Sequence, residues 1–284
     1  MKSDIRKILK EHADFPNLLR EIPGSPEKLF VRGSLREWPE KAVAIVGTRK
    51  ASALGLKVAE EFAGSLAKAD LTIVSGLAMG IDTASHKGAL KAGGRTIAVL
   101  GCGVDNVYPP QNENLANEII SSGGAIISEY ELGTPSYPNQ FIERNRIISG
   151  LCLATVVIEA PIRSGAIATA GFAGTQGRAV FAVPGPINHP NYRGSHALIR
   201  DGVTLVTSAK EILEELGFAT DSAETDNMEN NEILSALKDA GRPLALDEII
   251  EITGLETGET AALLAMLSIN KMVLETPAGY ILGK

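Results

Sequence analysis

The sequence contains little cysteine, a single tryptophan and no long apolar run. Its two cysteines, Cys102 and Cys152, stand alone inside apolar segments, without a CxxC pair or a nearby histidine cluster. We therefore expect two buried thiols and neither a disulfide framework nor a zinc site. No apolar run approaches the roughly 18 residues that a membrane-spanning helix needs. The charged segment 1–12 does not resemble a signal peptide, so a cytoplasmic protein outside the membrane is expected.

A surplus of positive charge is also missing. The chain has 27 basic and 34 acidic residues, a net charge of -7 and a pI near 5.3. Segment 41–220 is balanced, whereas residues 229–284 carry four basic and nine acidic side chains. A broad basic surface for nucleic acid is therefore excluded. Any anion site must be a local concentration of hydrogen-bond donors and cations.

Seven short apolar runs rich in β-branched residues recur through the middle of the chain. They are AVAIVG, LTIVSG, RTIAVLG, AIISE, ATVVIEA, AVFAVPG and VTLVT. Each of the first six leads into a segment that can form a helix, for example GLKVAEEFAGSLAKA. Continuous apolar strands separated by amphipathic helices are typical of a parallel sheet that helices cover on both faces. The pattern predicts a doubly wound, mostly parallel, Rossmann-like α/β domain over residues 41–218.

Small residues stand where these predicted strands end. Right-handed crossovers place the carboxyl ends of the strands on one edge of the sheet, where such folds bind ligands. Glycine allows a ligand to approach the backbone, and the following helix N-termini offer unpaired N–H groups to an anion. Standard phosphate and hydrolase motifs are missing, since GxGxxG in register, GxxxxGK[ST] and GxSxG do not occur. We therefore expect phosphate binding without a catalytic set, a metal or a cofactor.

Arginine residues occur near the predicted ligand-binding edge of the sheet, which lacks those motifs. Arg49 follows the first strand, and Arg144 and Arg146 lie on the predicted helix that enters the fifth. Two positions apart on a helix, Arg144 and Arg146 point about 200° from one another and cannot face the same groove. We assign the anion role to Arg144, and for Arg146 a structural tie to backbone carbonyls or Glu159 is an equal alternative. Phe141 shares the face of Arg144 and suits either a stacked base or core packing.

For three further polar residues we expect mainly structural roles. Asp82 lies at a predicted helix start, where capping is favoured over catalysis. His86, one turn later, is expected to pack or to form a local hydrogen bond. Glu159, at the tip of the fifth strand, is the one carboxylate that could act chemically, with an ion pair to an arginine as its structural role.

Together these motifs resemble the DNA-processing protein A (DprA, also called Smf) family. The resemblance covers roughly residues 25–215, in the order VAIVGTR, SGLAMGIDTASHKGAL, AVLGCGVDNVYPPQNENL, FIERNRIISGL, VVIEAPIRSGAIATAGFAGTQGRAVFAVPG and GSHALIRDG. It implies a homodimer that binds single-stranded DNA, displaces single-strand-binding protein and loads the RecA recombinase during natural transformation. It also implies that the protein is not an enzyme.

The resemblance further implies a DNA- and phosphate-binding site made of four segments. These are a first phosphate loop, a second phosphate loop, an arginine helix and the loop after the fifth strand. Their residues are Gly47, Thr48 and Arg49; Ser75, Gly76 and Gly80; Phe141, Arg144, Asn145 and Arg146; and Ser164, Gly165 and Thr169.

The two ends of the chain are expected to differ from the middle. Residues 1–40 are predicted as an extension that packs on the core, with LFVRGSL as an extended segment. Residues 219–228 are acidic and lack apolar periodicity, as a linker would. Residues 229–284 predict two or three helices and a hairpin, a winged-helix pattern. Because the recognition helix expected at 257–270 has one charged residue, Glu259, we favour protein contact or regulation over duplex DNA binding for this module.

Two other functions remain open. Phosphoribohydrolases acting on nucleoside monophosphates share a similar fold, but their PGGxGTxxE motif is replaced here by RSGAIATAGFAG, which lacks the glutamate. A scaffold that contacts RecA without a DNA site of its own is the second alternative.

Overall fold

The structure is a computed structural model that describes residues 5–33, 38–218, 232–269 and 272–283. The chain divides into two compact units, Met1–Ala219 and Thr220–Lys284, and each is described by itself. The expected acidic linker, 219–228, lies outside the described residues, as does Asn270 at the end of the expected recognition helix. No helix in the described ranges is long and apolar enough to span a bilayer.

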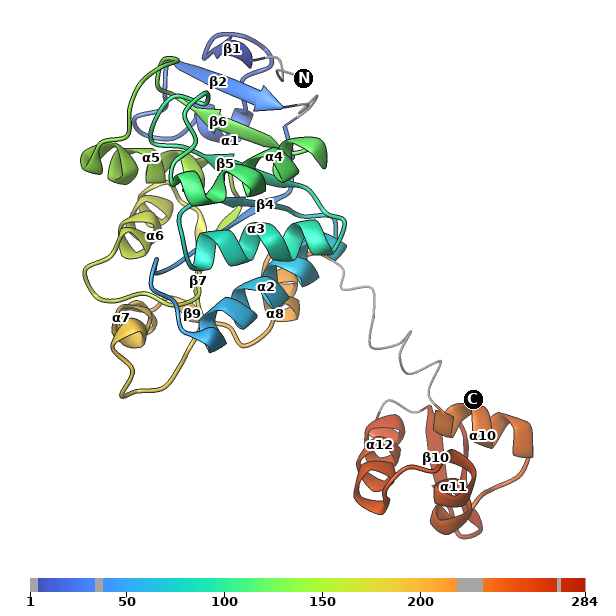
Figure 1. Cartoon of the computed structure of the whole chain (residues 1–284). Helices are drawn as coiled ribbons and strands as arrows, with labels where there is room; N and C mark the ends of the chain where they lie inside the picture. The colour runs from blue at the N-terminus through green and yellow to red at the C-terminus, as the bar shows by residue number, and fades with distance from the viewer. Residues whose placement is uncertain (1–4, 34–37, 219–231, 270–271, 284) are drawn as a thin grey trace. The chain divides into compact units, whose positions relative to one another are not determined.

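The first unit is built on one nine-stranded sheet (Figure 1). Its spatial order is β1-β2-β6-β5-β4-β3-β7-β8-β9. The strands are β1 Ile5–Leu9, β2 Lys28–Gly33, β3 Ala42–Val46, β4 Thr72–Ser75, β5 Thr96–Val99, β6 Ala125–Ser128, β7 Ala154–Val157, β8 Ala179–Ala182 and β9 Thr204–Leu205. Strands β3 to β9 are mutually parallel, and β2 pairs antiparallel with β6. The predicted parallel sheet and all seven of its strands are confirmed.

Helices cover both faces of this sheet. They are α1 Asn17–Arg20, α2 Ala53–Lys68, α3 Ile81–Lys91, α4 Glu113–Ser121, α5 Pro138–Gly150, α6 Gly165–Thr175, α7 Arg193–Arg200 and α8 Ala209–Glu215, with short 3-10 turns η1 Pro110–Asn112 and η2 Pro190–Tyr192. Helices α2, α3 and α8 pack on one face against side chains such as Ile45, and α5 and α6 pack on the other against side chains such as Ala44. Adjacent residues of β3 thus enter opposite cores, which explains why the strand sequence is apolar throughout.

The chain reverses direction across the sheet between β3 and β7. From β3 it winds outward through β4, β5 and β6, then returns to β7 on the other side of β3 and continues to β8 and β9. The loops after β3 and β7 therefore diverge at the carboxyl edge of the sheet. In doubly wound folds this is the position where a crevice opens for a ligand.

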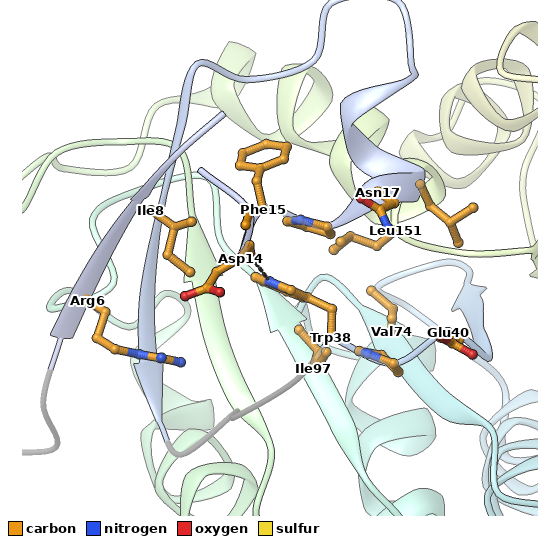
Figure 2. Close-up of a pocket in the computed structure, with 14 residues that line it drawn as sticks. Arg6, Ile8, Asp14, Phe15, Asn17, Trp38, Glu40, Val74, Ile97 and Leu151 are labelled. Carbon is orange, nitrogen blue, oxygen red and sulfur yellow. Dashed lines mark hydrogen bonds between the residues drawn. The ribbon is translucent and has the colours of Figure 1, made fainter. Parts of the chain in front are cut away.

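The N-terminal segment extends the sheet by two strands. The predicted extended segment LFVRGSL contains most of β2, whose Phe30 is opposite Ser128 of β6. Strand β1 was not predicted, because only Ile8 of its five residues is buried and the pattern is weak. A cavity of about 440 Å³ lies where this segment meets β4 and β5 (Figure 2). The single tryptophan, Trp38, lies beside it and donates from Nε1 to the carbonyl of Asp14 over 2.5 Å.

The second unit is the predicted winged-helix domain. It comprises α10 Glu232–Ala240, α11 Leu246–Thr253, α12 Thr257–Ile269 and the hairpin of β10 Val273–Thr276 and β11 Gly279–Leu282. Its core contains Ile233, Leu237, Leu264 and Val273, contributed by two helices and the hairpin. Gly254 ends α11 with a left-handed φ of 70°, a conformation that glycine adopts readily.

Candidate nucleic-acid interface

A cavity of about 650 Å³ opens at the carboxyl edge of the sheet, where β3 and β7 lie side by side. Its lining residues come from the segments after β3, β4, β5, β7 and β8 and from α5. Nine residues of the proposed DNA site line it: Gly47, Thr48, Arg49, Phe141, Arg144, Asn145, Ser164, Gly165 and Thr169. Four others do not: Ser75, Gly76, Gly80 and Arg146. The cavity also receives Lys50, Tyr108, Arg163 and Asn191, which the sequence interpretation did not include.

The first loop runs from Gly47 to the N-terminus of α2. Gly47 has no room for a side chain, because a Cβ there would collide with Ile81. Thr48 Oγ1 accepts from the amide of Lys50 over 3.2 Å, which fixes the turn, and Ser52 caps α2 by accepting from Gly55 N over 3.0 Å. Arg49 is left exposed at the cavity. The loop is thus rigid at its backbone and presents a cation.

The second proposed phosphate loop reaches the cavity through Ala78 and Asp82, whereas Ser75, Gly76 and Gly80 lie behind them and support the first loop. Ser75 is buried and donates its hydroxyl to Ile45 O over 2.7 Å. Gly80 has a φ of 81°, and a Cβ there would collide with Thr48 O. Only glycine fits both this left-handed backbone and this close approach. These small residues therefore allow two loops to pack. A glycine at the end of a strand does not show from sequence alone whether it serves loop packing or phosphate binding.

Arg144 lies on the cavity side of α5, but its guanidinium is buried. Nη1 donates to Gly76 O over 2.9 Å and to Val99 O, so the side chain ties α5 to the ends of β4 and β5. Burial lowers the pKa of Arg144 to about 10, while the nearby carboxylate of Asp82 opposes the shift. It remains a cation at neutral pH, and its buried Nε has no hydrogen-bond partner. Arg144 thus contributes positive potential from beneath the cavity.

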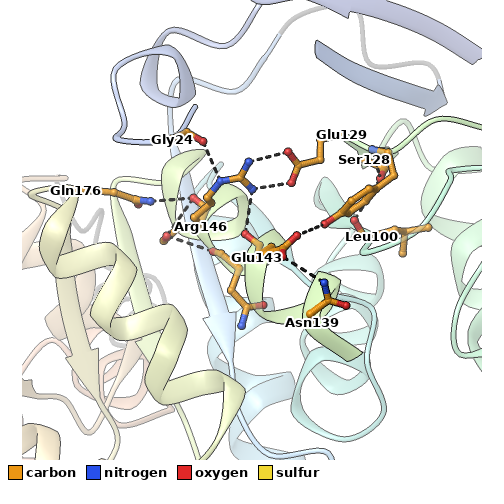
Figure 3. Close-up of polar contacts among 11 residues, drawn as sticks. Gly24, Leu100, Ser128, Glu129, Asn139, Glu143, Arg146 and Gln176 are labelled. Carbon is orange, nitrogen blue, oxygen red and sulfur yellow. Dashed lines mark hydrogen bonds and ion pairs between the residues drawn. The ribbon is translucent and has the colours of Figure 1, made fainter. Parts of the chain in front are cut away.

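Arg146 points to the other side of α5, as the helical spacing predicts (Figure 3). Both of its terminal nitrogens pair with the carboxylate of Glu129 over 2.6 Å, and Nε donates to Gly24 O over 2.8 Å. The expected tie to backbone carbonyls is confirmed, but the expected carboxylate partner Glu159 is wrong, because Glu129, directly after β6, pairs with Arg146. Glu129 raises the pKa of Arg146 further. This residue holds α5 to the N-terminal segment and β6.

Two aromatic rings and a guanidinium gather at the mouth of the cavity. The ring centroids of Phe141 and Tyr108 are 5.3 Å apart with a 33° tilt, and Arg49 Cζ lies 5.2 Å from the centroid of Phe141. Phe141 packs over Gly101, where a Cβ would come within 3.1 Å of its ring. Tyr108 is 41% exposed and lies on the segment between β5 and η1. Its signal in the sequence was the VYPP string within a quoted motif.

The loop after β7 leads into the start of α6. Ser164 caps this helix by accepting from Ile167 N over 3.4 Å. Asn145 of α5 donates from Nδ2 to Gly165 O over 3.1 Å, and Thr169 donates its hydroxyl to the same oxygen over 3.0 Å. The start of α6 is thereby held at the cavity, where Ser164, Gly165 and exposed Arg163 line it.

Glu159 is fully buried at the tip of β7 and does not line the cavity. Its Oε2 accepts from Ser52 N over 2.9 Å at the start of α2, and Oε1 lies 3.8 Å from Nδ1 of His189. The expected arginine partner is replaced by a backbone amide and a histidine. A carboxylate enclosed in this way stabilises the N-terminus of α2.

Asp82 and His86 form a buried layer under the cavity with Arg144. Asp82 accepts from Gly76 N over 3.1 Å and from Ala78 N over 3.3 Å, so it caps a loop rather than its own helix. Burial raises its pKa, against the opposing effect of Arg144. His86 Nδ1 lies 2.7 Å from Thr96 Oγ1. The Thr96 hydroxyl donates its hydrogen to Ile73 O and can therefore only accept from His86. His86 is therefore a neutral donor at Nδ1, and the local hydrogen bond expected for it is confirmed. Burial, assisted by Arg144, lowers its pKa to about 3.

Comparison with known proteins places the chain in a family. Residues 6–217 match the sequence profile of DNA recombination-mediator protein A, and residues 209–279 match the DprA winged helix domain. The chain belongs to the DNA recombination-mediator protein A (DprA/Smf) family. It is 38% identical to Protein Smf of Escherichia coli over 281 residues, which cover 94% of this chain and 74% of that protein. The resemblance inferred from the motifs is confirmed.

Solved structures of the family agree with the fold. DprA from Streptococcus pneumoniae superimposes with a TM-score of 0.71 at 41% identity, covering 75% of each chain. DNA processing protein A from Helicobacter pylori, described for its single-stranded DNA binding mode, superimposes with a TM-score of 0.68 at 26% identity, covering 76% of this chain and 98% of that one.

Replacing His86 by asparagine should flatten the dependence of stability on pH. In the wild type the unfolded histidine binds a proton below pH 6.5 and the folded one does not until about pH 3, so stability present above 6.5 is lost as the pH falls through this window. Asparagine keeps a donor toward Thr96 and does not titrate. Urea unfolding from pH 7.5 to 5 should show the wild type losing up to about 1.4 kcal/mol more per pH unit than the variant. Parallel curves would contradict a buried neutral His86.

Proposed function

We propose that this protein is a recombination mediator that binds single-stranded DNA in the 650 Å³ cavity at the carboxyl edge of the sheet. The observation that carries the proposal is the set of three exposed cations at this cavity, Arg49, Lys50 and Arg163. None of them has an ion-pair partner among the described residues. Exposed Lys68 also has no ion pair within the described ranges, but the three cavity cations converge on one site, whereas Arg146 and Lys91 are paired with carboxylates. Unpaired cations in an otherwise neutral unit favour an anionic ligand.

The aromatic pair of Phe141 and Tyr108 favours a nucleic acid strand with accessible bases as the ligand. A phosphate alone would use the cations and the α6 amides, but it would not use Phe141 and Tyr108. Base faces stack on such rings in single-strand-binding sites, where a cationic groove follows the backbone. In a duplex the base faces are already stacked on one another. The family membership and the single-stranded DNA binding described for the Helicobacter pylori relative support the same ligand.

The binding is expected to be independent of sequence and moderately sensitive to salt. No group of Asn, Gln or Arg side chains in the cavity is arranged to read base edges, since Asn145 is used by Gly165 O and Arg144 by two carbonyls. Two or three phosphate contacts would give a slope of log K against log salt of around -2. One such cavity binds weakly, so a homodimer that holds one strand at two cavities would gain affinity through effective concentration.

We extend the proposal to the wider role of the family. The strand would be incoming DNA during natural transformation, which the protein protects and transfers to RecA, with single-strand-binding protein as a further partner. No enzymatic activity is proposed: the one candidate carboxylate, Glu159, is buried away from the cavity against α2. This geometry disfavours the phosphoribohydrolase alternative. A scaffold without a DNA site would leave the unpaired cations and the aromatic pair without a role.

For the winged-helix domain we propose protein contact. The exposed face of α12 presents Ala261, Ala262 and Ala265, which offer neither a cation for phosphates nor a donor for bases. In the same domain Arg242 is paired with Glu248 over 2.9 Å. Duplex DNA binding through this helix is therefore disfavoured, and small apolar side chains suit a packed protein surface.

Replacing Arg49 by alanine should weaken binding of a labelled oligothymidine about tenfold and reduce the magnitude of the salt slope by about 0.7. The side chain is exposed, so the fold should be unchanged by circular dichroism. Lys68→Ala is the matched control, because it removes one exposed positive charge from the opposite end of α2. Fluorescence polarisation at several salt concentrations measures the affinity and the salt slope of each variant. Equal affinities for Arg49→Ala and Lys68→Ala would remove Arg49 from the site.

Replacing Tyr108 by alanine should weaken the same binding about five- to tenfold, because one stacked base loses its ring. Tyr108→Phe should bind as the wild type does, since the ring and not the hydroxyl makes the contact. Unlike Arg49→Ala, this change should leave the salt slope unaltered. A polarisation titration at several salt concentrations separates the two effects. A loss of affinity in Tyr108→Phe as large as in Tyr108→Ala would contradict stacking.

A further inference from the structure

Exposed apolar side chains gather at the edge of the sheet that carries the cavity. Eleven large apolar residues are exposed among those described before residue 219, and eight of them lie in the segments that follow the carboxyl ends of β3 to β8. One exposed residue after each strand forms what we call the apolar collar: Leu54, Met79, Tyr108, Ile142, Ile162 and Ile187. The helix-to-strand loops at the opposite edge contribute none, although all of them are described.

Folding does not account for this distribution. Ile187 is 89% exposed and Ile162 is 59% exposed, so neither packs in the core of the unit. Exposed apolar groups collected on one side of a protein mark a surface that another molecule covers. Tyr108 and Ile142 line the cavity itself, whereas Ile162 adjoins Arg163, which also lines it. Three of the six collar residues therefore lie at or next to the cavity that carries the exposed cations.

We propose that the apolar collar contacts the unpaired bases on both sides of the nucleotide held in the cavity. This inference rests on the proposed function and extends the proposed DNA-binding surface from the cavity along the carboxyl edge of the sheet. The collar crosses six neighbouring strands, from β6 to β8. Five strand spacings cover roughly 24 Å. That length corresponds to about seven nucleotides at the spacing of a stacked strand, and to fewer when the strand is extended.

Single-stranded nucleic acid fits this surface better than other ligands do. Each nucleotide presents a charged phosphate and an apolar base face, and this edge carries both exposed cations, Arg49, Lys50 and Arg163, and exposed apolar side chains. A duplex would bring only phosphates and leave the collar in water. The collar thus adds a contribution to affinity that depends on bases and does not depend on salt.

The test compares two oligonucleotides of 20 units, one of thymidine and one made entirely of abasic tetrahydrofuran units. The variant is Ile162→Ser combined with Ile187→Ser, since both side chains are exposed and lie outside the cavity lining. Polarisation should show the double variant binding oligothymidine about tenfold more weakly than the wild type, at an unchanged salt slope. Its affinity for the abasic strand should equal that of the wild type. Leu9→Ser on β1 is the control, with a similarly exposed apolar side chain at the far end of the sheet.

Each other outcome overturns a defined part of the account. If the wild type and the double variant bind oligothymidine equally, the apolar collar does not contact bases and serves another occupant, such as a protein surface. If both oligonucleotides lose affinity equally, the two isoleucines act on the backbone and the base contact is wrong. If the wild type binds neither oligonucleotide, the proposed function fails, and this inference fails with it.

Discussion

The buried guanidinium of Arg144 holds together the elements that form the cavity. It donates to the carbonyls of Gly76 and Val99, and so fixes α5 over the ends of β4 and β5. A buried cation must be hydrogen-bonded and compensated to be tolerated, and the two carbonyls and Asp82 supply this compensation. Because α5 also carries Phe141 and Asn145, Arg144 helps to position the aromatic ring and the α6 loop, together with Arg146 on the other side of the helix.

Removing Arg144 would therefore not isolate a role in binding. Its loss would leave the carboxylate of Asp82 buried without a cation, and breaking such a compensated group typically costs several kcal/mol. Arg49 differs in this respect, because it lies in solvent on a loop whose backbone is fixed by Thr48, Ser52 and Gly80. The site thus separates two tasks: a buried charged layer sets the geometry, and exposed cations and rings at the rim are available to a ligand.

The sequence predicted the sheet well because each strand is short, apolar on both faces and followed by a helix. It predicted the site less completely, because contacts across the chain decide which donors are free. Arg144 and Arg146 look alike in FIERNRIISGL, yet Arg144 donates to the carbonyls of Gly76 and Val99, whereas Arg146 pairs with Glu129, which follows β6. The sequence suggested Gly80 as a phosphate-binding glycine, and the structure shows that it also allows the close approach of Thr48 O.

The residues that sequence reasoning missed share one property. Lys50 and Arg163 directly adjoin predicted site residues and Tyr108 lies within a quoted motif, but the sequence did not show that these side chains and Asn191 meet at one cavity. Strand β1 was missed for a similar reason, since its pairing with β2 and not its own pattern makes it a strand. Long-range pairing of this kind is invisible in a single sequence.

The central claim is that the carboxyl edge of the sheet, and not its amino edge or the winged-helix domain, holds a single strand of DNA. Hydrogen–deuterium exchange of the full chain, with and without saturating oligothymidine, tests it most directly. The account predicts slower exchange in the loops after β3, β5 and β7, at residues 47–55, 101–109 and 161–167, and unchanged exchange at 92–95 and 122–124. Protection confined to the amino-edge loops or to α12, with these three loops unaffected, would contradict it.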